Sequence, residues 1–145
     1  MGKTRTAKSR GTKRVAFLLA CFLFAAASFG ECTNPLPVKK EFKESEAVVI
    51  ATVTSSHLAP QSWDTFDGTE FVVQISQTVK GKQSGEITIF SENTAEKYDL
   101  QIGQEYLLFL NNHYQHWVVN KCGNSGTIDQ DAKVIKELEH LLDNY

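Results

Sequence analysis

The chain has 145 residues, with 15 Lys and Arg against 17 Asp and Glu and a formal net charge of −2. The first 30 residues hold six of the basic residues and no acid, so the remaining 115 carry nine lysines, no arginine and a formal charge of −8. That length suits one domain and excludes a second, and the charge argues against nucleic acid or an anionic membrane as a partner. A basic protein, a cation or a neutral ligand is compatible, although we favour the simpler explanation that the acidic surface keeps the protein soluble.

The N-terminus has the pattern of a secretory signal peptide. Residues 1–14 carry the six basic residues, and Val15 to Ala27 is an apolar run that ends in small residues. At roughly 13 residues the run is shorter than the ~20 that a membrane-spanning helix needs. We expect a leader over residues 1–30, cleaved after Ala27 or Gly30, and a secreted or periplasmic protein. Membrane attachment is expected only if the leader stays uncleaved or is lipidated at Cys21.

Two cysteines, Cys32 and Cys122, remain in the single domain predicted over residues 31–145. An exported protein meets an oxidising compartment, in which paired cysteines form disulfides. We therefore predict a Cys32–Cys122 bridge. Because it closes a long loop, it would stabilise the domain by about 4 kcal/mol.

After the cysteine at position 32, the apolar residues recur mostly at every second position, which is typical of β-strands. Gly81 and Gly85 separate the second strand from the third, and Asn111 to His113 separate the last two, so two hairpins are predicted. The five predicted strands are Glu46–Ser55, Phe71–Val79, Glu86–Phe90, Tyr106–Leu110 and His116–Val119. They predict an all-β fold with a small closed or nearly closed barrel.

Two helices are predicted to bracket these strands. Pro37 to Ser45 has Val38 and Phe42 four residues apart, as on one face of a short helix. Near the C-terminus, apolar residues recur at helical spacing from Ala132 to Leu142, with Asp129 or Thr127 available as N-cap. We expect this second helix to pack on the barrel and not to bind a partner.

Two loops separate the strands. The connection from His57 to Gly68 contains Trp63 and Phe66, which either form a ligand or partner surface or cap the open end of the barrel. The connection from Ser91 to Gly103 is polar, contains Tyr98, and shows no recognisable chemistry.

Several short motifs occur in a familiar order between Cys32 and Cys122. The most specific are Val79-Lys80-Gly81 at a strand end and Gly103-Gln104-Glu105-Tyr106-Leu107-Leu108-Phe109 at a strand start. In order and spacing they resemble the tissue inhibitor of metalloproteinases and netrin-like family. The resemblance implies a five-stranded OB-fold barrel and a non-catalytic binding domain, whose leading target would be an extracellular or periplasmic metalloprotease.

Inhibitory members of that family use the α-amino group and carbonyl of a free N-terminal cysteine, in a Cys-x-Cys start, to chelate the zinc of the protease. Here Gly30-Glu31-Cys32 occupies that tripeptide, so Cys32 matches the second cysteine and the chelating cysteine is missing. Lys97-Tyr98 stands where the family has the cysteine that would pair with it. Cleavage after Gly30 would expose Glu31, whose amino group and carbonyl could still chelate. The candidate partner-binding residues are Glu31, Cys32, Thr33, Asn34, Pro35, Trp63 and Phe66.

We predict no catalytic residues, no cofactor and no metal site. The chain has no nucleophile elbow and no glycine-rich phosphate loop. His113 and His116 could ligate a transition metal, but no Cys or acid lies close in sequence to complete a set, so we interpret them as exposed turn residues. The alternative functions are an OB-type binder of small ligands or saccharides, which would use the barrel face and the Trp63/Phe66 loop, and a structural envelope protein.

Overall fold

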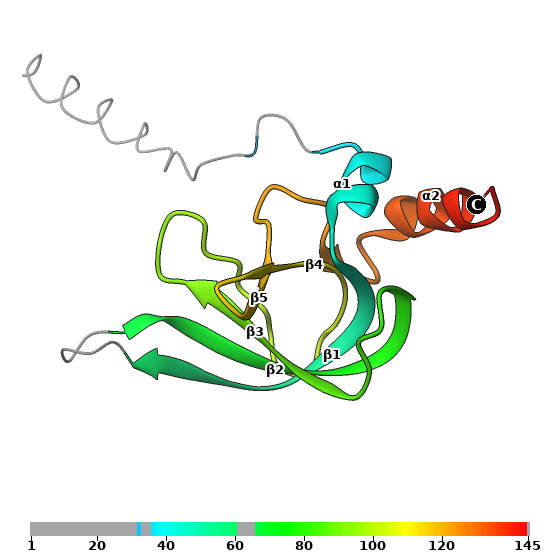
Figure 1. The fold of residues 1–145 in the computed structure, drawn as a ribbon. Helices are drawn as coiled ribbons and strands as arrows, with labels where there is room; N and C mark the ends of the chain where they lie inside the picture. Colours follow the sequence, from blue (N-terminus) through cyan, green and yellow to red (C-terminus); the bar gives the residue numbers. More distant parts are fainter. Residues whose placement is uncertain (1–31, 33–35, 61–65, 145) are drawn as a thin grey trace, which may run out of the picture. The chain divides into compact units, whose positions relative to one another are not determined.

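The structure is a computed structural model that describes Cys32, residues 36–60 and residues 66–144 (Figure 1). The predicted leader, Glu31, the segment 33–35 and the loop 61–65 lie outside the described residues. The elements are α1 (Val38–Glu44), β1 (Ala47–Pro60), β2 (Phe66–Lys80), β3 (Glu86–Glu92), β4 (Glu105–His113), β5 (His116–Val119), β6 (Gly126–Thr127) and α2 (Ala132–Leu142). The prediction of a mainly β chain bracketed by two helices is confirmed.

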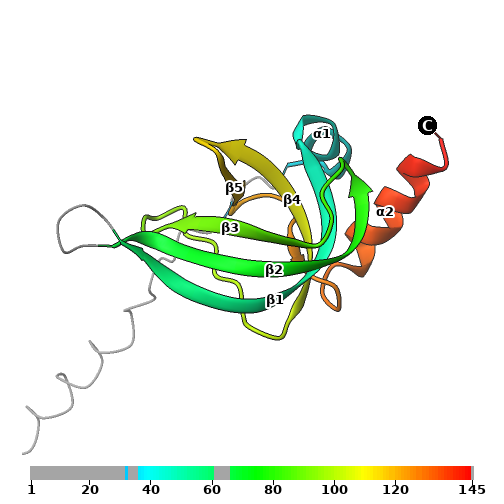
Figure 2. The ribbon, with the colours of Figure 1, turned by 60° about the horizontal axis from the view of Figure 1, so that its bottom comes forward.

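The strands form one mixed sheet whose hydrogen bonds run in a ring. The order is β1-β2-β3-β5-β4-β6, and β1 also pairs with β4, so the ring passes through β1 to β5 and returns to β1 (Figures 1 and 2). The pairings are antiparallel except for that between β3 and β5, which is parallel and consists of one residue pair, Ile89 with Trp117. The seam between β3 and β5 is therefore the most weakly paired part of the ring.

Residues 47–53 of β1 and 106–110 of β4 are buried on both faces of the sheet, which explains why these two runs are almost continuously apolar. Alternate residues of each strand face the inside of the ring, and the residues between them face the helices. The inner core includes Val49, Val53, Phe71, Leu108 and Leu110. The outer core joins Val48, Leu107 and Phe109 to Val38 and Phe42 of α1 and Leu138 of α2. Both helices thus cover the outer face of β1 and β4.

Strands β1 and β2 extend further than predicted and pair as a hairpin. β1 continues to Pro60 and β2 begins at Phe66, so most of the expected connection from His57 to Gly68 belongs to these two strands. His57 pairs with Glu70 across the two strands, and its Nε2 lies 2.6 Å from the glutamate Oε2. Side chains from Thr54 to Leu58 are exposed, so this stretch lacks the alternation that marks a strand in a sequence.

Two other boundaries differ from the prediction. The turn between β4 and β5 lies at Tyr114 and Gln115 and not at Asn111 to His113, because the asparagine-rich stretch continues β4. Helix α2 starts after Asp131, which makes no side-chain capping bond, whereas Asp129 and Thr127 were the predicted caps. Thr127 instead belongs to β6, a two-residue strand on the edge of β4 that the sequence did not predict.

The Lys80-Gly81 motif has a structural role at the end of α1. The Lys80 ammonium donates to the carbonyls of Phe42 (2.7 Å), Lys43 (3.0 Å) and Ser45 (2.5 Å). These are carbonyls that a helix end leaves without partners. Gly81 has a φ of +97°, and a Cβ there would lie 3.0 Å from the Ala47 Cβ, so the turn after β2 requires glycine.

Candidate functional site

The predicted disulfide is present and anchors the start of the described chain. Cys32 and Cys122 are bonded, with 5.4 Å between their Cα atoms, so the bridge ties the segment before α1 to the segment after β5. The Cys32 Sγ also lies 3.8 Å from the carbonyl oxygen of Lys121.

Asn124 strengthens this attachment two residues after the bridge. Its side-chain nitrogen Nδ2 donates to the Leu36 carbonyl (2.7 Å) and to Glu41 Oε2 (2.6 Å). Its backbone N–H donates to the same glutamate oxygen (2.6 Å). Gly123 permits the approach, because a Cβ there would lie 2.0 Å from Glu41 Oε1. The segment after Cys122 is thus hydrogen-bonded both to Leu36, just before α1, and to Glu41 within α1.

Glu41 is a buried carboxylate that serves this contact. It is only 3% exposed, and its Oε1 makes no hydrogen bond among the described residues. Burial raises the pKa of Glu41 above its ordinary value, and the two bonds from Asn124 offset part of that increase. No role was assigned to Glu41 from the sequence.

Ser125 connects the same segment to the strands and to the loop after β3. Its hydroxyl accepts the Phe109 N–H (2.8 Å), and its carbonyl accepts the Tyr98 hydroxyl (2.8 Å). Burial, with a smaller effect from Asp131, raises the pKa of the Tyr98 phenol, which keeps it a donor. The role of this tyrosine is structural, and sequence analysis missed it. The run Cys122-Gly123-Asn124-Ser125-Gly126, dense in turn residues directly after a cysteine, was the available signal.

Lys121 connects the loop after β3 to the region of the disulfide. Its ammonium donates to the Ala95 carbonyl (2.7 Å) in the loop after β3. Three parts of the chain therefore meet beside the disulfide, and we call the surface formed by Cys32, Ala95, Lys121 and Cys122 the N-terminal edge. Lys97 belongs to this same loop and pairs with Asp99 at 2.8 Å.

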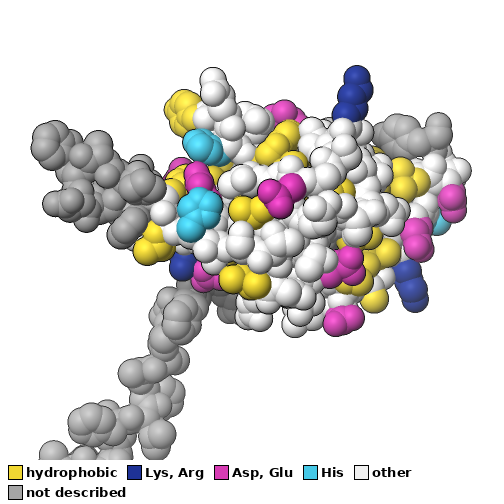
Figure 3. Space-filling model, turned by 90° about the horizontal axis from the view of Figure 1, so that it is seen from below, with side chains coloured by type: hydrophobic (Ala, Val, Ile, Leu, Met, Phe, Trp, Pro, Cys, Tyr) yellow, Lys and Arg dark blue, Asp and Glu magenta, His cyan; other side chains and the backbone are white. Residues whose placement is uncertain are grey.

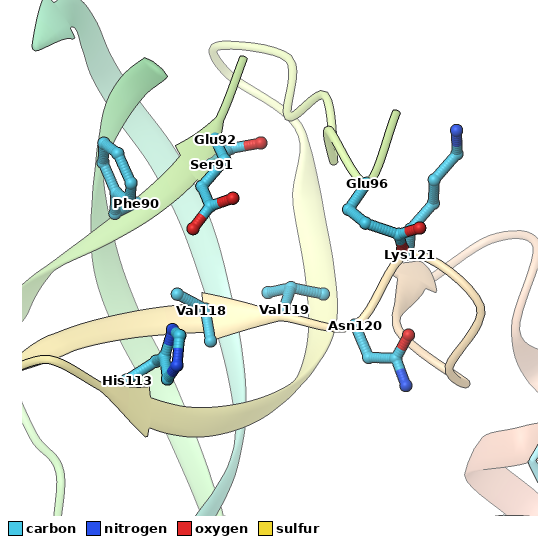
Figure 4. A pocket seen from close by; sticks show the side chains of 9 residues that line it. All are labelled: Phe90, Ser91, Glu92, Glu96, His113, Val118, Val119, Asn120 and Lys121. Atoms are coloured by element: carbon cyan, nitrogen blue, oxygen red, sulfur yellow. The ribbon is translucent and has the colours of Figure 1, made fainter. Parts of the chain in front are cut away.

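A pocket of about 190 Å³ opens next to the N-terminal edge, at the weakly paired seam between β3 and β5 (Figure 4). Lys121 lines both features. We call it the β3–β5 pocket, and its lining residues are Phe90, Ser91, Glu92, Glu96, His113, Val118, Val119, Asn120 and Lys121. Figure 4 shows the Glu92 carboxylate pointing from the end of β3 toward β5, above Val118 and His113.

The β4–β5 turn follows His113, which lines this pocket, and it holds an exposed aromatic ring. Tyr114 and Gln115 have φ values of 50° and 70°, as in a type I′ turn, which ordinarily takes Asn and Gly. Tyr114 is 85% exposed, and its ring centroid lies 4.3 Å from that of His113. Keeping two non-glycine residues in this conformation costs stability.

His113 and His116 lie directly opposite each other at the base of this turn. His113 packs against Tyr114, while His116 packs against Phe90 with 5.2 Å between ring centroids. Within residues 36–60 and 66–144 and at Cys32, no group of three or more His, Cys, Asp or Glu side chains is placed to hold a metal ion. The imidazoles of His113 and His116 therefore pack against two different aromatic rings.

The other predicted partner-binding residues are mostly beyond what the structure describes. Glu31, Thr33, Asn34, Pro35 and Trp63 lie outside the described residues. Phe66 is the first residue of β2, with its backbone opposite Pro60. On the face in Figure 3, acidic side chains outnumber lysines, in keeping with the charge of −8 over residues 31–145. In the described part of the chain, neither helix is long and apolar enough to cross a bilayer.

No model of a known protein family matches the chain, and no curated protein matches it either.

Proposed function

We propose that the chain is an exported, non-catalytic protein-binding domain with an OB-type barrel, and that it restrains an extracellular or periplasmic metalloprotease through its N-terminal edge. The strand order supports the barrel. A five-stranded ring with one parallel contact between its third and fifth strands is compatible with the partly open Greek-key barrel of OB folds. The disulfide supports an exported location, because such bonds persist in oxidising compartments.

The observation that carries the proposal is that Lys121, next to the disulfide, is hydrogen-bonded to the loop after β3. In the family that the sequence resembles, the inhibitory cysteine is bonded to a cysteine at the position of Lys97-Tyr98. In this chain the disulfide at Cys32 and the Lys121–Ala95 bond bring the same two segments to one edge without that second bridge. We infer that these two bonds hold the N-terminal edge together in place of a second disulfide.

A chain that begins at Glu31 would place its free amino group one residue from this anchor. The amino group and the Glu31 carbonyl would chelate the zinc of the protease and displace the water that attacks the substrate. Because no disulfide orders that residue, binding would include the cost of fixing one backbone unit, about 1–2 kcal/mol, or roughly tenfold in affinity. We therefore expect inhibition to be weaker than for a chain with the second bridge.

The test is inhibition of a panel of zinc metalloproteases by the exported protein that begins at Glu31. The matched control is the same protein with its α-amino group acetylated, which leaves every other contact in place. We expect micromolar inhibition of at least one enzyme and a loss of at least roughly tenfold on acetylation, since the acetylated nitrogen no longer ligates zinc. Inhibition that survives acetylation, or no inhibition of any enzyme, would contradict the proposal.

The pocket sizes leave the binding of a small ligand as the alternative function. The β3–β5 pocket has about 190 Å³, and a second hollow that shares Phe90 and Glu92 with it has about 410 Å³, within the roughly 300–1,000 Å³ typical of ligand sites. The saccharide alternative depends on Trp63, which lies outside the described residues, and it stays a prediction.

A further inference from the structure

The β3–β5 pocket has a lining that suits one long, positively charged side chain. Its volume is about 190 Å³, and a second hollow of about 410 Å³ shares Phe90 and Glu92 with it. In protein interfaces, single anchor side chains commonly fill small pockets of the partner. Phe90, Val118 and Val119 give this pocket an apolar wall against which an aliphatic stem would pack.

The acidic groups of the pocket lack cationic partners of their own. Glu92 and Glu96 both line it, and among the described residues neither lies within ion-pair distance of a lysine or histidine. Lys121 is the one cation in the lining, but its ammonium is bonded to the Ala95 carbonyl, and Figure 4 shows it pointing away from Glu92. The pocket therefore favours a positively charged occupant, and residues 31–145 contain no arginine to supply one.

Two rings in the lining offer faces on which a flat cation can stack. His113 lines the pocket at the end of β4, and Phe90 lines it from β3. A guanidinium group is planar, pairs with a carboxylate through two parallel hydrogen bonds and stacks on aromatic faces, whereas an ammonium does neither as well.

We propose that the β3–β5 pocket binds one arginine side chain of a basic protein partner, with the guanidinium paired to Glu92 and stacked beside His113. This inference rests on the proposed function, since it takes the partner to be a protein. It adds the chemical feature by which that partner is recognised. The pocket adjoins the N-terminal edge through Lys121, so one partner could contact both.

The test is a titration of the exported protein with N-acetyl-arginine amide, followed by ¹H–¹⁵N NMR. We expect saturable shifts at the amides of Glu92, His113 and Val118, with millimolar affinity. N-acetyl-citrulline amide has nearly the same shape without the charge, and we expect it to leave these amides unshifted. Glu92→Gln should weaken the binding of the arginine amide at least fivefold. Glu86→Gln, at an exposed position on the same strand outside the pocket, should leave it unchanged.

Several results would overturn the inference. These are shifts spread over the whole acidic surface without saturation, equal shifts with the citrulline amide, or unchanged affinity in Glu92→Gln. N-acetyl-lysine amide that binds as tightly as the arginine amide would refute recognition of the guanidinium. Because Glu92 is exposed at the end of β3, its substitution should leave the fold intact, which the dispersion of the same spectra reports.

The failure of this inference can be told apart from failure of the proposed function. If a protease is inhibited and Glu92→Gln leaves the inhibition constant unchanged, the arginine pocket is wrong and the inhibitory function stands. If the arginine amide binds as expected but no protease is inhibited, the pocket stands and the proposed target class is wrong.

Discussion

Replacement of Asn124 by alanine should destabilise the domain strongly. The variant removes the bonds from Nδ2 to the Leu36 carbonyl and to Glu41 Oε2, and it keeps the backbone bond to the same carboxylate. Glu41, only 3% exposed, would then have a single donor. A buried charge with too few hydrogen bonds is costly, because water no longer compensates it.

The expected loss in the free energy of unfolding is about 2–4 kcal/mol. The bond to the carboxylate contributes about 1.5–3 kcal/mol and the bond to a neutral carbonyl about 0.5–1.5 kcal/mol. Domains of this size have total stabilities of about 5–15 kcal/mol, so the loss would be a large fraction of the whole.

The assay is urea unfolding of the oxidised protein, with the free energy obtained by linear extrapolation. Asn93→Ala is the matched control, because it removes the same side chain from an exposed loop position. A second comparison places Asn124→Ala in a Glu41→Gln background, where the loss should be smaller because the acceptor is no longer charged. A loss below about 1 kcal/mol in the wild-type background, within the range of ordinary surface substitutions, would refute the role of this contact.

Three further predictions concern stability. Burial raises the pKa of Glu41 in the folded state, so the folded chain binds the carboxyl proton of Glu41 more tightly than the unfolded chain does. The contribution of Glu41 to stability is therefore greatest below about pH 4, and it declines as the pH rises through the raised pKa. The free energy of unfolding of the wild type minus that of Glu41→Gln should therefore fall over this pH range, and a flat or rising difference would show that the carboxylate is not destabilised by burial. Serine at both Cys32 and Cys122 should lower the free energy of unfolding by about 4–5 kcal/mol in chemical denaturation, given the sequence separation of 90, and an unchanged midpoint would contradict a structural bridge. Lys80→Met should cost about 2–3 kcal/mol and speed amide exchange in α1, since the carbonyls at the helix end lose a charged donor, whereas Lys82→Met at an exposed position should do neither.

The strands could be located from the sequence because their apolar pattern is strong. Both faces of the sheet are buried at residues 47–53 of β1 and 106–110 of β4, and the apolar runs there reflect this directly. In the outer half of the β1–β2 hairpin, the side chains of β1 from Thr54 to Leu58 are exposed and mostly polar. The sequence pattern therefore underestimated the length of β1. The β4–β5 turn was misplaced because Tyr114 and Gln115 occupy positive-φ positions without the Asn or Gly that usually signals them.

The candidate site was only partly accessible to sequence analysis. The disulfide could be predicted because residues 31–145 contain just two cysteines. The contact between Glu41 and Asn124 joins positions 83 residues apart, on a helix and on a loop, and no local pattern connects them. The β3–β5 pocket is likewise built from a strand end, a loop and a turn that only the ring of strands brings together.

The most direct test of the central claim, that the working protein is an exported domain whose chain starts beside the Cys32–Cys122 bridge, is intact mass with N-terminal sequencing of the exported protein before and after reduction. We expect a chain that begins at Glu31 or Cys32 and gains two mass units on reduction. A start at Ser28 or earlier, an uncleaved leader, or free thiols at both cysteines would contradict it.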